Sequence, residues 1–336
     1  MFPITYQSTG EFMKLMQLYA AMKSDLQAIE DQMAITVASD LPTLSEASLH
    51  LLKAGGKRIR PIFVLLSGKF GTYSVETLKR VAVPLELIHM ATLVHDDVID
   101  DANIRRGQLT VKSKWDNRIA MYTGDYIYAK ALTVITELDK PRIHQVLSGS
   151  IVQMVIGEME QIRDFFNVDQ SVRNYLLRIR RKTALLIAIS CQLGALATDA
   201  PPRASHALYR FGYNVGMAFQ ITDDLLDLCG TEKAIGKPPG SDLRQGNITL
   251  PVLYALQDAS IKDKLLEEIE LIKISEGVAN SAAAVKLVRS SSGIKKAEEM
   301  ASRYIAKALK ALEGLPDIPA KRNLADIARI VAKRSY

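Results

Sequence analysis

The feature that most constrains the fold of this chain is an apolar segment that ends in a cluster of carboxylates. Residues 81–95 are mostly apolar, and the next six residues, 96–101, include four aspartates. Carboxylates this close repel one another unless cations neutralise them. Oxygen ligands without a Cys or His cluster suit Mg²⁺. The pattern predicts a buried helix that ends at a cation site; the alternative is a solvated acidic turn.

Residue spacing places this acidic cluster on defined helix faces. His89, Asp96 and Asp100 are seven and four residues apart, so they share one face of a helix. Asp97 and Asp101 form a second pair four residues apart, beside the first. A helix that continues through Asp101 would therefore present two adjacent carboxylate pairs.

A second acidic motif favours the cation site over the solvated turn. Asp223, Asp224 and Asp227 repeat the DDxxD spacing at the end of the apolar stretch 211–219. Gln220 lies one helical turn before Asp224. Two such motifs, each at the end of a long apolar helix, predict two facing carboxylate clusters that bind one diphosphate through shared Mg²⁺ ions.

The order of these motifs resembles that of the trans-isoprenyl (polyprenyl) diphosphate synthase family, from about residue 45 to the C-terminus. The resemblance is carried by GGKRIRP at 55–61, by the first Asp motif with RRG at 105–107, by KTA at 182–184, and by GK at 236–237 with GSDL at 240–243. Within the family, segments 46–67 and 114–128 are most similar to the large subunit, component II, of bacterial heptaprenyl diphosphate synthases.

Helical periodicity without any run of alternating polarity predicts an all-α fold. The resemblance implies a single-domain antiparallel helix bundle around a central active-site cavity, the isoprenoid synthase fold. The expected organisation is one domain, 1–336, with an N-terminal helical segment 1–42, a catalytic core 43–260 and C-terminal helices 261–336. Helices are expected at 11–38, 59–70, 119–136, 142–165, 175–197 and 204–228, and a loop at 103–107.

The reaction that the resemblance implies is head-to-tail transfer of an allylic prenyl group to isopentenyl diphosphate. Several Mg²⁺ ions, three by resemblance, would be bound by Asp96, Asp97, Asp100, Asp223, Asp224 and Asp227. The isopentenyl diphosphate site would comprise Lys57, Arg60, His89 and Arg106. The allylic diphosphate site would comprise Arg105, Lys182, Thr183, Gln220 and Lys237. The catalytic set would be the six aspartates with Lys182, Thr183 and Gln220. The side-chain oxygens of Thr183 and Gln220 would face an allylic cation.

Each of these assignments has a plainer alternative. Lys57 and Arg60 at a helix N-terminus are a natural anion site, but they also fit a solvated basic turn. A lone histidine such as His89 fits a buried core position. Lys182 and Thr183 within an apolar helix fit a lysine whose stem covers apolar surface.

Product length is expected to depend on the residues before Asp96. Ala91 and Thr92 are small where short-chain members of the family often have an aromatic residue. A growing chain would then pass between helices, and we expect a product longer than geranylgeranyl, near heptaprenyl, for a quinone side chain such as that of menaquinone. The alternative is a floor made by Ile88 or by a neighbouring helix or subunit.

One position departs from the family pattern. Many members have a lysine where this chain has Asn247, and an amide cannot form an ion pair with phosphate as a lysine does. This puts one diphosphate contact in doubt and leaves the metal ligands unaffected.

Composition excludes several other classes. The 43 basic and 37 acidic residues give a net charge of +6, yet no zinc-finger spacing, RNP-like segment or basic tail indicates nucleic-acid binding. The two cysteines do not form a disulfide framework. No apolar stretch is long enough to span a bilayer. We expect a cytoplasmic protein with at most peripheral membrane contact for product release.

Three other functions remain open. A single-chain homodimeric synthase of another length, hexaprenyl to solanesyl, has the same motifs. A class I terpene cyclase would normally lack Lys57, Arg60 and His89 and the second complete DDxxD. A non-catalytic partner subunit need not retain both acidic motifs. The component II resemblance implies a dimer, a heterodimer with a smaller component I or otherwise a homodimer.

Overall fold

The computed structural model describes residues 9–231, 238–275 and 280–333. Their internal contacts divide the chain into two compact units. One unit comprises Met1–Gln17, Gly149–Ala188 and Arg210–Tyr336, and will be called the C-terminal unit. The other comprises Leu18–Ser148 and Ile189–Tyr209, and will be called the N-terminal unit. The single-domain organisation expected from the sequence stays a prediction.

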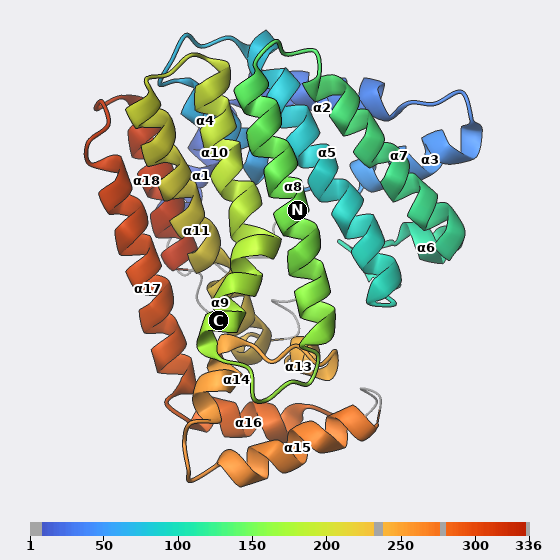
Figure 1. The fold of residues 1–336 in the computed structure, drawn as a ribbon, viewed down its shortest axis with the longest axis vertical. Helices are drawn as coiled ribbons and strands as arrows, with labels where there is room; N and C mark the ends of the chain where they lie inside the picture. The colour runs from blue at the N-terminus through green and yellow to red at the C-terminus, as the bar shows by residue number, and fades with distance from the viewer. Residues whose placement is uncertain (1–8, 232–237, 276–279, 334–336) are drawn as a thin grey trace. The chain divides into compact units, whose positions relative to one another are not determined.

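The described residues are almost entirely helical, which confirms the all-α prediction (Figure 1). The helices are α1 (Thr9–Ala21), α2 (Lys23–Val37), α3 (Pro42–Lys53), α4 (Ile59–Gly68), α5 (Val75–Ile99), α6 (Val111–Lys114), α7 (Asn117–Ile135), α8 (Pro141–Arg163), α9 (Val172–Ile179), the π-helical turn η1 (Arg180–Ala184), α10 (Leu185–Ala197), α11 (Pro202–Cys229), α13 (Ser241–Arg244), α14 (Leu250–Ala255), α15 (Lys262–Ile274), α16 (Ala282–Ser290), α17 (Gly293–Leu312) and α18 (Pro319–Ala332). A two-stranded hairpin pairs β1 (Ile104–Arg105) with β2 (Gln108–Leu109).

The N-terminal unit is built around α5, which packs against α7, α4 and α2 (Figure 1). Ser74 caps the helix, because its side chain accepts a hydrogen bond from the backbone N–H of Thr77. The helices α5 and α7 approach closely at Gly124, where a Cβ would lie 2.2 Å from Nε2 of His95. The absence of a side chain at Gly124 therefore allows the end of α5, with its acidic motif, to pack on α7.

The C-terminal unit has its core where α9, η1 and α11 meet the helices that follow. Its buried cluster includes Tyr175, Met217, Ile221 and Leu225, which packs with residues of α14 to α17. The spacing of the apolar residues on α11 places one side of the helix in this core. The acidic motif at the end of α11 therefore projects from a firmly packed helix.

Three local expectations from the sequence are wrong. The helix expected at 11–38 is broken at Met22, between α1 and α2. Part of the loop expected at 103–107 forms strand β1. The second carboxylate pair does not form on α5, because this helix ends at Ile99 and Asp101 adopts a positive φ of 51°.

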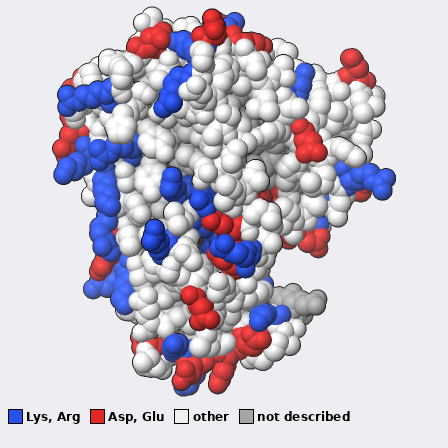
Figure 2. Space-filling view, in the orientation of Figure 1, with Lys and Arg blue, Asp and Glu red and all other residues white. Residues whose placement is uncertain are grey.

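No helix in residues 9–231, 238–275 and 280–333 is long and apolar enough to cross a membrane. Figure 2 shows basic side chains along α17, whose sequence includes Lys295, Lys296, Arg303, Lys307 and Lys310. These lysines and the arginine lie on the solvent side of an amphipathic helix, as expected for a helix with one buried face.

Candidate active site

The first acidic motif lies at the C-terminal end of α5, in the N-terminal unit. Asp96 and Asp100 are half-buried, and the backbone N–H of Asp100 donates to the carbonyl of Asp96 at 2.7 Å. Asp97 is only 3% exposed, and its Oδ1 accepts from Nε and Nη2 of Arg105, each at 2.7 Å. Burial raises the pKa of Asp97, and the charge of Arg105 opposes this rise. The hairpin residue Arg105 is thus held beside the motif.

Asp101 is separated from this cluster. It pairs with Lys112 at the start of α6 and is 89% exposed. Asp96, Asp97 and Asp100 therefore share the C-terminal end of α5, whereas Asp101 lies in solvent.

A cluster of basic side chains surrounds His89 in the same unit. Burial and the charges of Arg60, Arg106 and Arg105 hold the pKa of His89 well below its usual range. A Cβ on Gly56 would lie 2.8 Å from Nη1 of Arg106, so the guanidinium lies against the Gly56 backbone. Burial lowers the pKa of Arg60, and Arg106 lowers it further. Like charges held this close are stabilised by a bound anion.

Arg60 also has an unused donor. Its buried Nε finds no hydrogen-bond partner among the residues that the structure describes. Arg60 belongs to the first turn of α4, where backbone N–H groups also lack partners within the helix. Lys57 precedes this turn, and its carbonyl accepts a hydrogen bond from the hydroxyl of Tyr19. All four residues predicted for the isopentenyl diphosphate site therefore belong to the N-terminal unit. Three of them, Arg60, His89 and Arg106, form one cluster.

Sequence reasoning missed the support beneath this cluster. Arg58 is buried, adopts a positive φ of 45° at the start of α4, and pairs with Glu30 of α2 and with Glu86 of α5 at 3.3 Å. The charge of Glu86 also raises the pKa of Arg60 and of Arg106, partly offsetting their burial. Glu86 lies three residues before His89, a signal for a shared helix face that the sequence did contain.

The second acidic motif lies at the end of α11, in the C-terminal unit. Asp224 is 3% exposed, its Oδ2 accepts from the hydroxyl of Tyr175 at 2.6 Å, and its Oδ1 accepts from Nε2 of Gln220 at 2.9 Å. Burial and the charges of Asp242 and Asp223 raise the pKa of Asp224 to about 8. Negative charge is thus crowded at this motif.

Asp227 connects the motif to the chain that follows. Its Oδ2 accepts from the backbone N–H of Asp242 at 3.1 Å, and its carbonyl accepts from the N–H of Gly240 at 2.8 Å. This holds α13 against the end of α11, with Asp242 beside the motif. The predicted diphosphate ligand Lys237 lies outside the described residues.

The residues Lys182 and Thr183 lie in the π-helical turn η1, where the backbone N–H of Leu185 donates to the carbonyl of Arg180. The turn interrupts the helix expected at 175–197. Such turns change the direction of side chains and are frequent at functional sites. Lys182 Nζ lies 2.7 Å from Oε2 of Glu158, and the hydroxyl of Thr183 donates to Oε1 of Gln220 at 2.7 Å.

Two glycines allow other helices to approach this turn. A Cβ on Gly157 of α8 would lie 2.7 Å from Cβ of Arg181, and a Cβ on Gly216 of α11 would lie 2.6 Å from Cα of Ala184. The turn is therefore fixed from two sides by close backbone contact.

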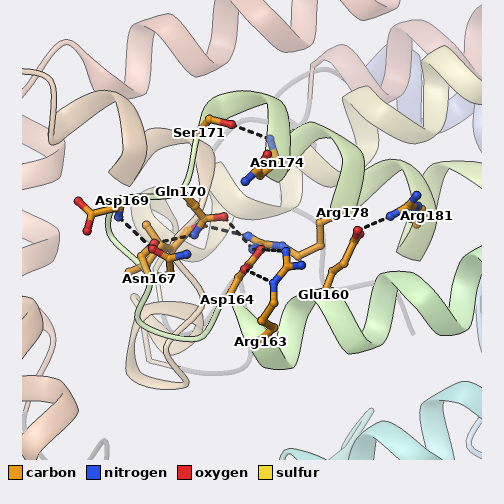
Figure 3. A network of polar contacts seen from close by, with 11 residues as sticks. Glu160, Arg163, Asp164, Asn167, Asp169, Gln170, Ser171, Asn174, Arg178 and Arg181 are labelled. Carbon is orange, nitrogen blue, oxygen red and sulfur yellow. Dashed lines mark hydrogen bonds and ion pairs between the residues drawn. The ribbon is translucent and has the colours of Figure 1, made fainter.

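A buried network anchors the turn and the segment near residue 248 (Figure 3). Arg178 donates to Oε1 of Gln170 at 2.9 Å and to the carbonyl of Ile248 at 3.1 Å, and lies 3.8 Å from Oδ2 of Asp164. Arg181 pairs with Glu160. The network lies next to Asn247, whose backbone N–H donates to the carbonyl of Asp242 at 2.8 Å.

The residues predicted to set product length lie on α5. Ile88 and Ala91 are fully buried, and the hydroxyl of Thr92 donates to the carbonyl of His89 at 2.8 Å. Ala91 contributes only a methyl group to the packed interior. Its role in setting product length stays a prediction.

The donor sets fit hard divalent cations. Both motifs offer only carboxylate oxygens, the ligands that Mg²⁺ prefers. Burial and, after it, the charges of Asp242 and Asp223 raise the pKa of Asp224, and a bound cation would favour its ionised form. Among the described residues, no three carboxylate, imidazole or thiol groups meet around one point.

Comparison with known proteins gives one consistent result. Residues 41–288 match the model of the polyprenyl synthetase family. The chain is 54% identical over 324 residues to heptaprenyl diphosphate synthase component 2 of Geobacillus stearothermophilus, covering 96% of this chain and 100% of that protein. It is 51% identical to the component 2 protein of Bacillus subtilis, covering 96% of this chain and 92% of the other.

The fold agrees with this result. The crystal structure of heptaprenyl diphosphate synthase from Staphylococcus aureus superposes with a TM-score of 0.86 at 41% identity, covering 93% of this chain and 98% of the other. The sequence match covers 96% of this chain and the structural match covers 93%. The chain is an all-α prenyltransferase and belongs to the polyprenyl synthetase family.

Proposed function

We propose that this chain is the catalytic large subunit of a two-component heptaprenyl diphosphate synthase. It adds isopentenyl diphosphate repeatedly, head to tail, to an allylic diphosphate such as farnesyl diphosphate, and the product supplies a quinone side chain. The observation that carries the proposal is the 54% identity over the whole length of a component 2 protein. Both acidic motifs are present, which disfavours a non-catalytic subunit.

The family depends on Mg²⁺ in general, and we propose several ions per site, three by family resemblance. Asp96, Asp97 and Asp100 form one ligand set, and Asp223, Asp224 and Asp227 form a second. Bound Mg²⁺ supplies positive charge that stabilises the diphosphate leaving group. Each oxygen of Asp224 accepts one hydrogen bond and keeps a further lone pair that a cation could use.

The cluster around His89 is proposed to bind isopentenyl diphosphate. Arg60 and Arg106 offer guanidinium donors, and the buried Nε of Arg60 lacks a partner among the described residues. His89 is held neutral, so it can donate one hydrogen bond without adding another positive charge to the site. Lys57 completes the predicted set.

Other residues are proposed to act on the allylic diphosphate. Arg105 and Lys182 bind it by charge, with Lys237, which lies outside the described residues, as a third cation. Loss of the diphosphate produces an allylic cation, and the oxygens of Thr183 and Gln220 stabilise that cation. The double bond of isopentenyl diphosphate then attacks, and a proton leaves to the released diphosphate, so no protein base is required.

A partner subunit is supported by an apolar stripe on α8. Val152, Val155, Ile156, Met159 and Ile162 recur at helical spacing, and Val155 and Met159 are 60% and 61% exposed. Exposed apolar stripes of this kind mark protein interfaces. The partner is proposed to be a small component I subunit, and a second copy of this chain is the alternative.

Product analysis tests the proposal. The purified chain is incubated with farnesyl diphosphate, labelled isopentenyl diphosphate and Mg²⁺, with and without a candidate small subunit, and products are separated by chromatography. Heptaprenyl product only with the small subunit is expected. Product from the chain alone would favour a homodimeric synthase, and no prenyl product under either condition would contradict the assigned activity.

A further inference from the structure

Four side chains of the C-terminal unit form a continuous chain of hydrogen bonds. The hydroxyl of Tyr175 donates to Asp224 at 2.6 Å, Nε2 of Gln220 donates to the other oxygen of Asp224 at 2.9 Å, and the hydroxyl of Thr183 donates to Oε1 of Gln220 at 2.7 Å. This series of hydrogen bonds links α9, α11 and η1. We call it the Tyr175–Thr183 relay.

The direction of the relay follows from chemistry. Both bonds at Asp224 are donated to it, by the hydroxyl of Tyr175 and by Nε2 of Gln220, so the amide of Gln220 turns its NH₂ group toward Asp224. The carbonyl of Gln220 then faces Thr183, whose hydroxyl must donate. The proton of Thr183 is therefore committed to Gln220, and the remaining lone pairs on its oxygen are left for another group.

The two ends of the relay differ in burial. Tyr175 is 1% exposed and Asp224 is 3% exposed, whereas Thr183 and Gln220 are half-buried. In a buried environment linked hydrogen bonds strengthen one another. The buried end at Tyr175 and Asp224 thus fixes the orientation of the Thr183 hydroxyl at the more exposed end.

We propose that Tyr175 and Asp224 are positioning residues that hold the hydroxyl of Thr183 as a hydrogen-bond acceptor and a fixed negative dipole. Tyr175 keeps Asp224 in place, Asp224 fixes the orientation of the Gln220 amide, and the amide fixes the Thr183 proton. That this dipole faces an allylic cation rests on the proposed function. The hydrogen bonds of the relay do not depend on that function.

The relay is tested first by unfolding of the metal-free chain. Tyr175→Phe removes one end of the relay and Thr183→Val the other, and Tm is measured for both single variants and the double variant. The expected double shift is smaller than the sum of the two single shifts, because either change disconnects the same chain. Tyr254→Phe is the matched control, since Tyr254 packs against the same core, and its shift should add to that of Thr183→Val.

Additive shifts for Tyr175→Phe and Thr183→Val would overturn the relay. If Tyr175→Phe does not fold, Gln220→Met replaces it in the same cycle, because that variant interrupts the relay at its centre.

The role of Thr183 toward a cation is tested by steady-state kinetics of the chain together with the small subunit. Tyr175→Phe is expected to lower kcat for the first condensation about tenfold, with the KM for isopentenyl diphosphate unchanged. In a Thr183→Val background the same change should have no further effect, while Thr183→Ser should restore the tenfold response. Independent, multiplying effects would contradict a role through Thr183. If the wild-type chain forms no prenyl product even with the small subunit, that result would contradict the proposed function and the cationic ligand, and the unfolding cycle would still decide the relay.

Discussion

Lys182 and Glu158 form an ion pair, with Nζ of the lysine 2.7 Å from Oε2 of the glutamate. Lys182 is the residue that the sequence assigns to the allylic diphosphate, so the carboxylate on α8 occupies the position of a competing anion. Both side chains are only partly exposed, 27% and 30%. Glu158 therefore limits the positive charge that Lys182 offers to a ligand.

Replacing Glu158 tests this competition. Glu158→Gln is expected to lower the KM for farnesyl diphosphate about two- to fivefold, the range of a partly exposed ion pair of up to about 1 kcal/mol. Steady-state kinetics at constant ionic strength provide the measurement. Glu270→Gln, which removes an exposed ion pair with Lys273 on α15, is the control. A higher KM in Glu158→Gln would instead mean that the glutamate orients the lysine.

The close contact at Gly216 predicts a specific sensitivity to a methyl group. Gly216→Ala would place its Cβ 2.6 Å from Cα of Ala184, so the backbone of the π-helical turn must shift. We expect a loss of about 1–3 kcal/mol in the free energy of unfolding, together with reduced kcat. Gly149→Ala on α8 is the control, because its Cβ meets no atom within 4 Å, and it should stabilise the chain by up to about 1 kcal/mol. Equal effects of the two changes on denaturant unfolding would argue against the packing at η1.

The neutral state of His89 predicts a pH dependence of stability. Burial and neighbouring arginines hold its pKa well below the value of about 6.5 that a histidine has in an unfolded chain. Below about pH 6.5 the unfolded chain binds a proton that the folded chain does not. The free energy of unfolding therefore falls as the pH drops, by at most about 1.4 kcal/mol per pH unit for one proton.

His89→Gln should flatten this slope between about pH 6.5 and pH 5, measured by denaturant titration of the metal-free chain. His206→Gln is the control at an exposed position of α11. An unchanged slope in His89→Gln would show that other groups cause the loss of stability.

A substitution on α5 tests which residue sets the product length. Ala91→Phe is expected to shorten the product, because an aromatic ring would fill space in the fully buried position that a methyl group occupies. Overpacking should also cost about 1–3 kcal/mol of stability. Ala91→Ser keeps the residue small and should retain the wild-type length. Chromatography of the products decides it, and an unchanged length in Ala91→Phe would contradict the assignment.

The sequence by itself determined the helical class, the approximate course of most helices and the two acidic motifs at the ends of α5 and α11. These features depend on local periodicity and on short motifs, which are visible along the chain. The sequence also shows two adjacent arginines, Arg105 and Arg106, shortly after the first acidic motif. It failed at Asp101, because helical spacing alone does not reveal that α5 ends at Ile99.

Only the tertiary structure decided which side chains meet. The partners of Asp224, Lys182 and Arg58 are Tyr175, Glu158 and Glu86, which lie 24 to 49 positions away in the chain. The π-helical turn at Lys182 likewise depends on close contact with Gly157 and Gly216 of other helices. Such pairings follow from packing between helices distant in sequence, and no local pattern specifies them.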